Sequence, residues 1–288
     1  LLPQGESQNG LQKMLILIWV TYCIYQRIIR RRVMFSIKQF MWNNPLFKWI
    51  MYLLSWIKNY LFYEIRFSVR KVLRLYKYVD GQYAQIEEFK NKHLGERCFI
   101  LATGPSLTVE DVRKLKKEYT FGMNSICMLF DELGWETTYY GVQDRGVFEK
   151  LVDKYQKLQD TVLFVGDGIP DSERNKVKSI PFAINYLDHK HSYKRLNTKF
   201  SFDVLKQVYD GYTITYSLIQ IAVYMGFKEI YLLGNDCSYP NDPKKQHFMD
   251  FGHYDSSTLT ARDRIIFAYQ YAKDFLKESD VKILNATR

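Results

Sequence analysis

Several residues whose types suit ligand binding stand directly after short apolar segments. The apolar run FILA leads into Thr103-Gly104-Pro105-Ser106, and Thr108-x-x-Asp111 then has the form of a helix capping box. A strand, a glycine turn and a helix N-terminus in succession would gather backbone N–H groups and the positive end of a helix dipole at one point. That point suits a phosphate, although such a turn also serves simply to join a strand to a helix. Neither GxxxxGK[ST] nor a complete GxGxxG is present.

Polar side chains follow the next apolar segments in the same way. Asn124 comes after FGM, Gln143 and Asp144 after TTYYGV, and Asp236 shortly after EIYLLG. If these segments are parallel strands, their carboxyl ends meet at one edge of the sheet, so the polar side chains converge there. Asn and Asp are also common helix caps and turn formers, which explains any one of them by itself.

A later block contains further candidates for the same edge. Thr213 and Thr215 begin an apolar helix, and the polar loop that follows Asp236 holds His247 and His253. Histidine suits general acid–base catalysis because its ordinary pKa lies near neutrality. A loop histidine is more often a solvated residue with no such role. The spacing of the two histidines is unlike HExxH, so we predict no zinc site.

Alternating strands and helices must position these residues. The pattern predicts an α/β domain over 95–288, with a doubly wound, mostly parallel sheet covered by helices on both faces. Residues 170–202 have weak periodicity, and we expect a loop or lid there. The expected strands are 98–102, 119–123, 138–142, 162–165, 229–233 and 281–284, and the expected helices are 109–117, 146–158, 215–225 and 259–277.

The net charge of +10 is concentrated at the start of the chain. Residues 1–80 hold 13 Lys and Arg against 3 Asp and Glu, which leaves 28 of each kind in 81–288. A neutral folded domain argues against nucleic acid as a partner. The basic segment is rich in aromatic residues, and over 61–77 basic and apolar side chains alternate at helical spacing. We expect 1–80 to be a helical segment that associates with an anionic membrane surface; the alternative is a helical hairpin packed on this domain or a partner subunit.

Two further features bear on location. The apolar run 15–25 is about half of the ~20 residues that a transmembrane helix needs. The four cysteines lack CxxC spacing, and no cleavable signal pattern precedes them, which favours a reducing compartment. The expected location is therefore the cytoplasm, peripheral on the inner face of the cell membrane. The sequence leaves open whether the chain forms a homo-oligomer.

Some of these motifs, in this order, resemble those of two related groups of proteins. ILATGPSL, Asn124, YMGFKEIYLLGNDCSY and the QHF of 246–248 are similar to the bacterial CMP-sialic-acid-dependent sialyltransferases and to the wider domain family named after the 6-hydroxymethylpterin diphosphokinase MptE. The closing KILNAT also resembles the second group. The similarity covers about 95–288 and leaves the basic N-terminus unexplained.

The sialyltransferase resemblance implies a Rossmann-like nucleotide-sugar fold without an obligatory metal, and it favours a CMP-sugar. The turn at Gly104 and Ser106, together with Asn124, would hold the nucleotide. Tyr239 would hold the phosphate, and His247 would deprotonate the acceptor hydroxyl. This chain departs from that family at Thr103 and Asp144. An acid at position 144 suits a diphosphate bound to Mg²⁺ better than a metal-free sialyl donor.

Three functions follow as hypotheses. The first is a membrane-surface glycosyltransferase that moves a sugar from a nucleotide-activated donor to a surface glycan or lipid-linked acceptor, with His247 as the base and Asp144 as a second catalytic residue. The second is an Mg²⁺-dependent diphosphokinase in which Asp144 and Asp236 hold the metal. The third is a non-catalytic scaffold for surface-polysaccharide assembly. For the first two, the ligand-binding residues are Thr103, Gly104, Pro105, Ser106, Asn124, Gln143, Thr213, Thr215, Asp236 and Tyr239.

Overall fold

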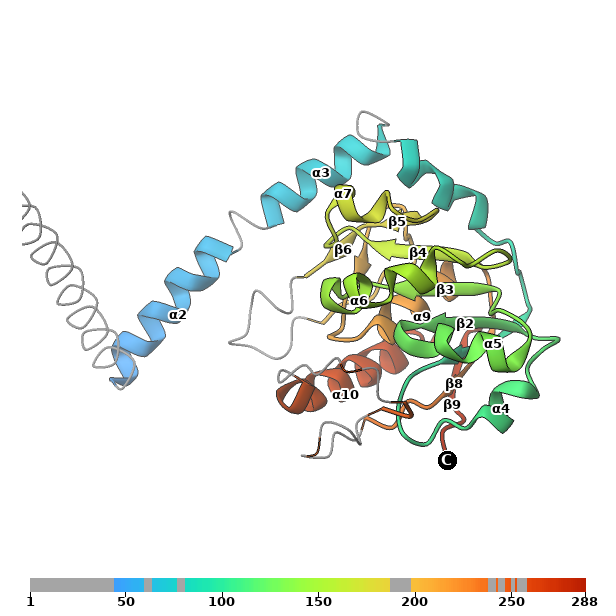
Figure 1. Ribbon diagram of the computed structural model, residues 1–288. Helices are drawn as coiled ribbons and strands as arrows, with labels where there is room; N and C mark the ends of the chain where they lie inside the picture. Colours follow the sequence, from blue (N-terminus) through green and yellow to red (C-terminus); the bar gives the residue numbers. More distant parts are fainter. Residues whose placement is uncertain are drawn as a thin grey trace, which may run out of the picture. The chain divides into compact units, whose positions relative to one another are not determined.

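The computed structural model describes residues 44–59, 64–76, 81–186, 198–237, 242, 247–249, 252 and 258–288 (Figure 1). The chain divides into two units, Leu1–Lys58 and Asn59–Arg288, and each is described by itself. The second unit holds the sheet and every candidate site residue that the structure describes.

The second unit is built on a sheet whose strands run in the order β5-β4-β3-β2-β1-β8-β9. All of its pairings are parallel, which confirms the predicted fold class. A two-stranded parallel pair, β6 (Ile184–Asn185) and β7 (Val208–Tyr209), lies outside this sheet. The strands of the main sheet are β1 (Arg97–Leu101), β2 (Tyr119–Met123), β3 (Tyr139–Val142), β4 (Val162–Gly166), β5 (Ile180–Phe182), β8 (Glu229–Leu233) and β9 (Lys282–Asn285).

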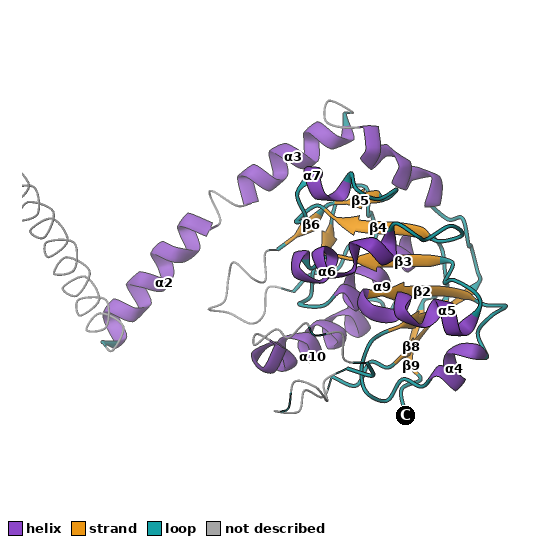
Figure 2. Ribbon diagram, viewed as in Figure 1, coloured by secondary structure: helices purple, strands orange, loops and turns teal. Residues whose placement is uncertain are grey.

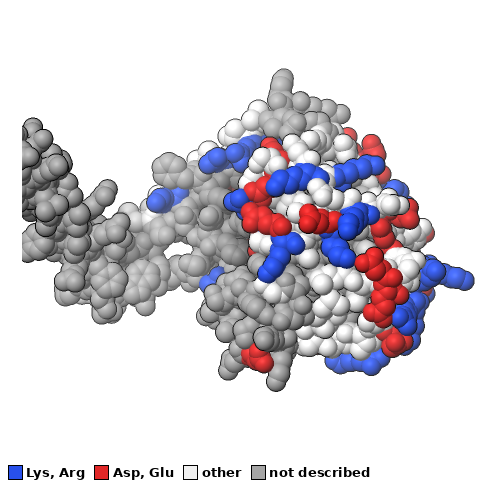
Figure 3. Space-filling model, in the orientation of Figure 1, with Lys and Arg blue, Asp and Glu red and all other residues white. Residues whose placement is uncertain are grey.

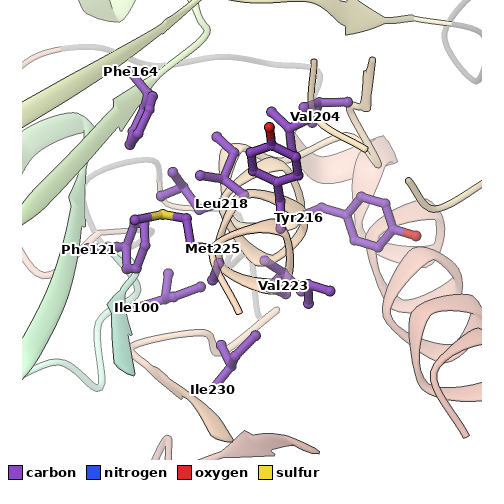
Figure 4. Close-up of a cluster of buried hydrophobic side chains, with 14 of the residues drawn as sticks. Ile100, Phe121, Phe164, Val204, Tyr216, Leu218, Val223, Met225 and Ile230 are labelled. Atoms are coloured by element: carbon purple, nitrogen blue, oxygen red, sulfur yellow. The ribbon is translucent and has the colours of Figure 1, made fainter. Parts of the chain in front are cut away.

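Helices cover both faces of the sheet, as Figure 2 shows. On one face, α9 (Ile214–Tyr224) is buried along its whole length and packs on strand residues such as Ile100 and Phe121 (Figure 4). The helices α10 (Thr258–Phe275) and η2 (Gly81–Phe89) complete that layer. The opposite face is covered by α4 (Val109–Arg113), η3 (Asn124–Leu129), α5 (Phe130–Leu133) and α6 (Arg145–Tyr155). The central strands are thus buried on both sides, which explains their continuous apolar runs.

Two predictions differ from the structure by more than three residues at the end of an element. The helix expected over 109–117 ends at Arg113, because the following N–H groups of Leu115 and Glu118 bond three residues back and tighten the chain into turns. The segment expected to be a loop or lid contains α7 (Asp171–Arg174), β5 and β6. These strands have only three and two residues, too few to produce a visible alternation in the sequence. Residues 187–197 lie outside the described residues, and a lid there stays a prediction.

Two helices precede the α/β domain in sequence. The first, α2 (Pro45–Asn59), begins where Asn44 Oδ1 accepts from the Leu46 N–H at 3.0 Å and proline takes the first helical position. The second, α3 (Ile65–Leu75), belongs to the second unit. Among the described residues, no helix is both long and apolar enough to cross a bilayer. Arg74, one of the basic residues in the alternating pattern of 61–77, has a buried side chain and so does not lie on a solvent-exposed basic face.

Candidate functional site

The candidate site lies where the direction of the strand order changes. Strand β1 pairs with β2 on one side and with β8 on the other, so successive crossovers leave β1 toward opposite edges. In open parallel sheets, a crevice for ligands forms outside the carboxyl ends of the strands at this switch point. The sequence motifs after β1, β2 and β8 therefore meet at the place where the fold favours a ligand.

The turn after β1 packs directly against the end of β8. The Gly104 N–H donates to Gly234 O at 2.8 Å, and the Ser106 N–H donates to Asp236 Oδ2 at 3.2 Å. A Cβ atom at position 104 would collide with the Asp236 carboxylate and the Gly234 carbonyl, so only glycine fits. This close approach brings together four of the predicted residues, Thr103, Gly104, Ser106 and Asp236, with Pro105 exposed at the tip of the turn.

The same contact changes what the turn offers to a phosphate. One N–H group that was expected to be free already binds the Asp236 carboxylate. Helix α4 has only five residues, and its N-cap Thr108 accepts from the Asp111 N–H at 3.2 Å, as the capping-box pattern predicted. A phosphate at this turn would have to share the Ser106 N–H with Asp236 or displace its carboxylate.

Asn124, at the end of β2, has an unusual and firmly held backbone. Its φ of 48° lies in the left-handed region, which Asn tolerates better than most residues. Its carbonyl oxygen accepts from the Tyr140 hydroxyl at 2.6 Å and from the Tyr155 hydroxyl at 3.0 Å. The side-chain Oδ1 is buried and has no hydrogen-bond partner in the described part of the chain. A buried acceptor without a donor is costly unless a ligand or water supplies one.

His247 lies over the end of β1. Its Nδ1 is 3.3 Å from Thr103 Oγ1, and the next residue, Phe248, donates its N–H to Thr103 O at 3.0 Å. Phe248 and Met249 pack against the core on the α6 face, which fixes this short segment to the domain. The structure thus brings His247 to the Gly104 turn. Tyr239 and His253 lie outside the described residues.

The remaining predicted residues have structural contacts of their own. Gln143 Oε1 accepts from the Ser217 hydroxyl of α9 at 2.7 Å, which joins the end of β3 to that helix. Thr213 is the N-cap of α9. Thr215 is buried, and its hydroxyl lies 3.4 Å from Sδ of Met123, the last residue of β2, and accepts from the Thr213 hydroxyl at 3.3 Å. Asp144 is the N-cap of α6 and accepts from the Val147 N–H at 2.8 Å.

The strand order separates the two carboxylates that were considered for magnesium. Asp144 follows β3 and Asp236 follows β8, three strand positions apart. At about 4.8 Å per strand, their backbones are roughly 14 Å apart, too far for both to bind one ion at about 2.1 Å. Within the residues described, no group of three or more His, Cys, Asp or Glu side chains could hold a metal. The donor set therefore does not fit a magnesium ion shared by these two carboxylates.

The strand-end rule also applies to a residue that our sequence analysis did not single out. Asp167 directly follows β4, and its Oδ1 accepts from the Ile184 N–H at 2.9 Å. Burial raises the pKa of this carboxyl, against the opposing effects of the Ile184 hydrogen bond and of Arg74. The sequence analysis also did not identify three residues whose hydroxyl groups contact this edge, namely Ser217, Tyr140 and Tyr155. Only the packing of α9, η3 and α6 shows what these hydroxyl groups contact.

The chain was compared with curated proteins, with solved structures and with protein-family models. A search of curated proteins finds no match. Among solved structures, the Maf glycosyltransferase of Magnetospirillum magneticum AMB-1 aligns with 14% identity and a TM-score of 0.45, over 69% of this chain and 33% of that one. This chain therefore spans about a third of that protein. A mammalian sialyltransferase, solved in complex with Gal-beta-1-3GalNAc-ortho-nitrophenol, aligns with 10% identity and a TM-score of 0.32, over 75% of this chain and 85% of that one.

The family comparison is more specific. The model of one protein family matches residues 71–242, which is more than half of the chain and includes the ends of β1, β2, β3, β4 and β8. The resemblance expected from the Gly104 turn, Asn124 and the Asp236 segment is thereby confirmed. This chain belongs to the family described as 6-hydroxymethylpterin diphosphokinase MptE-like.

Proposed function

We propose that this protein is a glycosyltransferase that binds a nucleotide-activated sugar at the carboxyl edge of β1, β2 and β8. One observation carries the proposal: two buried side-chain oxygens, Ser106 Oγ and Asn124 Oδ1, have no hydrogen-bond partner among the described residues. They follow adjacent strands at the switch point. A hydroxyl can donate to a phosphate oxygen, and an amide oxygen can accept from an amino group of a base. A nucleotide supplies both groups.

His247 is the proposed general base. In the tautomer whose Nδ1–H donates to Thr103 Oγ1, 3.3 Å away, Nε2 is the ring nitrogen that takes the proton of the acceptor hydroxyl. The hydroxyl oxygen then forms a bond to the anomeric carbon of the sugar. The bond from that carbon to the nucleotide phosphate breaks, and the nucleotide leaves with the electron pair. No step in this reaction requires a metal.

The donor class comes from the sequence resemblance, and the acceptor class comes from the basic segment 1–80, which a membrane-bound acceptor would explain. A CMP-sugar is the favoured donor, and a surface glycan or lipid-linked glycan is the proposed acceptor. Over the face drawn in Figure 3, acidic and basic side chains are interspersed on the second unit. That distribution supports a small anionic ligand held by a few local groups rather than a nucleic acid, which calls for a continuous basic surface.

A second candidate is the Mg²⁺-dependent transfer of diphosphate from ATP to a small hydroxyl substrate, which the family's name favours. Because Asp144 and Asp236 do not lie close enough to share an ion, this reaction would need Mg²⁺ held by one carboxylate and the ATP phosphates. Asp236 is the better candidate, because its Oδ2 accepts from the Ser106 N–H and so holds the carboxylate at the Gly104 turn, where the phosphates would lie.

A thermal-shift panel of CMP-, UDP- and GDP-sugars and ATP, with and without Mg²⁺, separates the candidates. A ligand at 100 times its Kd stabilises the fold by about 2.7 kcal/mol, which raises Tm by a few degrees. We expect a metal-independent shift with a nucleotide-sugar. A shift only with ATP and Mg²⁺ would establish the diphosphokinase instead. A scaffold would show no thermal shift with any donor, and it would keep its function when Asn124 and His247 are both replaced.

The base is tested once the donor is known. His247→Ala should lower kcat by roughly 10²–10⁴-fold and leave donor affinity nearly unchanged, since the residue acts on the acceptor. His253→Ala, from the same loop, is the matched control and should keep its activity. Turnover that survives His247→Ala but is lost in His253→Ala would show that the other histidine is the base.

A further inference from the structure

Helix α3 exposes an apolar stripe on the second unit. Ile65, Val69, Val72, Leu73 and Tyr76, hereafter the α3 stripe, are each at least 36% exposed. Their spacing of three and four residues places them on one face of the helix, within an arc of about 100°. Five adjacent apolar side chains on one exposed helix face form a patch, unlike the scattered single apolar residues normal on a protein surface.

The opposite face of α3 holds the helix to its own domain. Phe67 and Arg74 are buried there, about 180° from the α3 stripe. The Arg74 guanidinium lies 5.3 Å from the centroid of the Phe67 ring and 5.5 Å from that of Tyr83, and it donates to Lys206 O at 3.1 Å. The α3 stripe is therefore not the surface by which the helix packs on this domain.

The charges beside the α3 stripe indicate what covers it. Arg66 and Arg70 are exposed on one flank, and no acidic residue occurs between Ile65 and Leu75. Apolar side chains with cations on one flank and no acidic residue within the helix fit the interface of a bilayer with anionic headgroups, where the apolar groups enter the acyl boundary and the cations meet the phosphates. A protein interface of this composition would need a matching acidic rim.

Helix α2, in the first unit, has the same character by itself. Leu46, Trp49, Leu53, Leu54 and Ile57 are exposed at helical spacing, and the helix contains no acidic residue. Tryptophan is enriched where membrane meets water. We propose that the α3 stripe docks the second unit on an anionic membrane surface, and that α2 by itself is a second interfacial helix. This inference stands independently of the proposed reaction.

The test is sedimentation of the full chain with vesicles of phosphatidylcholine alone and with 30% phosphatidylserine, a fraction chosen to resemble an anionic leaflet at roughly physiological potential. The triple variant Ile65→Gln/Val69→Gln/Val72→Gln should weaken vesicle binding by about tenfold or more, because it lacks three apolar side chains that the membrane would bury. The matched control, Leu94→Gln/Ile266→Gln/Leu284→Gln, alters three exposed apolar residues elsewhere on the domain and should bind as the native chain does.

A second variant and its control test how much the cations beside the α3 stripe contribute to vesicle binding. Arg66→Gln/Arg70→Gln should weaken binding to the anionic vesicles by about tenfold at low salt, with a much smaller effect at high salt. Lys116→Gln/Lys117→Gln, which removes two exposed cations from the domain, should not. Circular dichroism confirms that each variant is folded.

Three results would overturn the proposal. The native chain could fail to bind either vesicle. The stripe variant could bind as tightly as the native chain. Or analytical ultracentrifugation could show a native dimer that becomes a monomer in the stripe variant, in which case the α3 stripe contacts a second copy of the chain.

Discussion

The two hydroxyl groups that hold the Asn124 carbonyl should act as one unit. Tyr140 and Tyr155 are almost fully buried, with ring centroids 5.7 Å apart, and replacing either by Phe keeps the ring while removing the hydroxyl. In Tyr155→Phe, the carbonyl retains the Tyr140 hydrogen bond, so the cost should be about 1 kcal/mol. Tyr140→Phe should cost more, about 2 kcal/mol, because its hydroxyl also accepts from the Cys127 N–H at 2.9 Å.

The double variant tests the coupling. With both hydroxyl groups absent, the Asn124 carbonyl loses both donors, and the free energy of unfolding should fall by about 1 kcal/mol more than the sum of the single effects. Urea unfolding followed by circular dichroism measures each corner of the cycle. Tyr139→Phe is the matched control: its hydroxyl contacts His93 Nε2 at 2.6 Å in a different network, so its effect should add to that of Tyr155→Phe.

The same four proteins also show whether the two hydroxyl groups matter for ligand binding at the candidate site. If the two tyrosines hold Asn124 in its left-handed conformation for a ligand, the double variant should lose as much donor affinity as Asn124→Ala does. Strict additivity in stability, or full donor affinity in the double variant, would refute the reasoning that the two hydroxyl groups position this residue.

Two further outcomes follow from buried groups elsewhere in the domain. Gln220 accepts from the Ser201 and Tyr209 N–H groups, both at 3.0 Å, and donates to Tyr209 O at 2.7 Å. Gln220→Leu should therefore lower the free energy of unfolding, measured by urea titration, by about 3–5 kcal/mol. The control Gln156→Leu, at an exposed position, should change it by under about 1 kcal/mol. Burial raises the pKa of Cys127 from 9.0 to about 11. Since the thiolate is the nucleophile and burial also blocks the reagent, its alkylation at pH 8 should be at least about 100-fold slower than that of the same thiol in guanidinium chloride. Mass spectrometry of the labelled peptide would contradict this if the two rates were equal.

The elements of the domain could be predicted because their signals are local. The runs around Phe121 and Ile230 are apolar and bounded by turn residues, and β2 and β8 have the predicted bounds. Asn124 and Asp236 could be chosen as site residues by the rule that ligands bind after the ends of parallel strands. That rule needs only the positions of strands along the sequence.

The contacts that give these residues their character could not be predicted, because they join distant parts of the chain. The hydrogen bond from Ser106 to Asp236 depends on β1 lying beside β8. Likewise, the amphipathic pattern of α3 shows two faces but not which one packs on the domain. Arg74 belongs to the basic pattern in sequence, yet two aromatic rings and a backbone carbonyl bury it.

The pairing of β1 with β8 also has a consequence for how the protein folds. Cys98 of β1 lies opposite Ile230 of β8, so 132 positions separate the two halves of the switch point. Such a non-local contact forms slowly, because a long loop must close before the pairing contributes any stability. Strands β1 to β4 succeed one another in the sheet as in the chain and can pair early. On a ribosome, the edge at which Gly104 meets Asp236 cannot form until nearly the whole domain has been synthesised, so a truncated or stalled chain would have most of the sheet but no site.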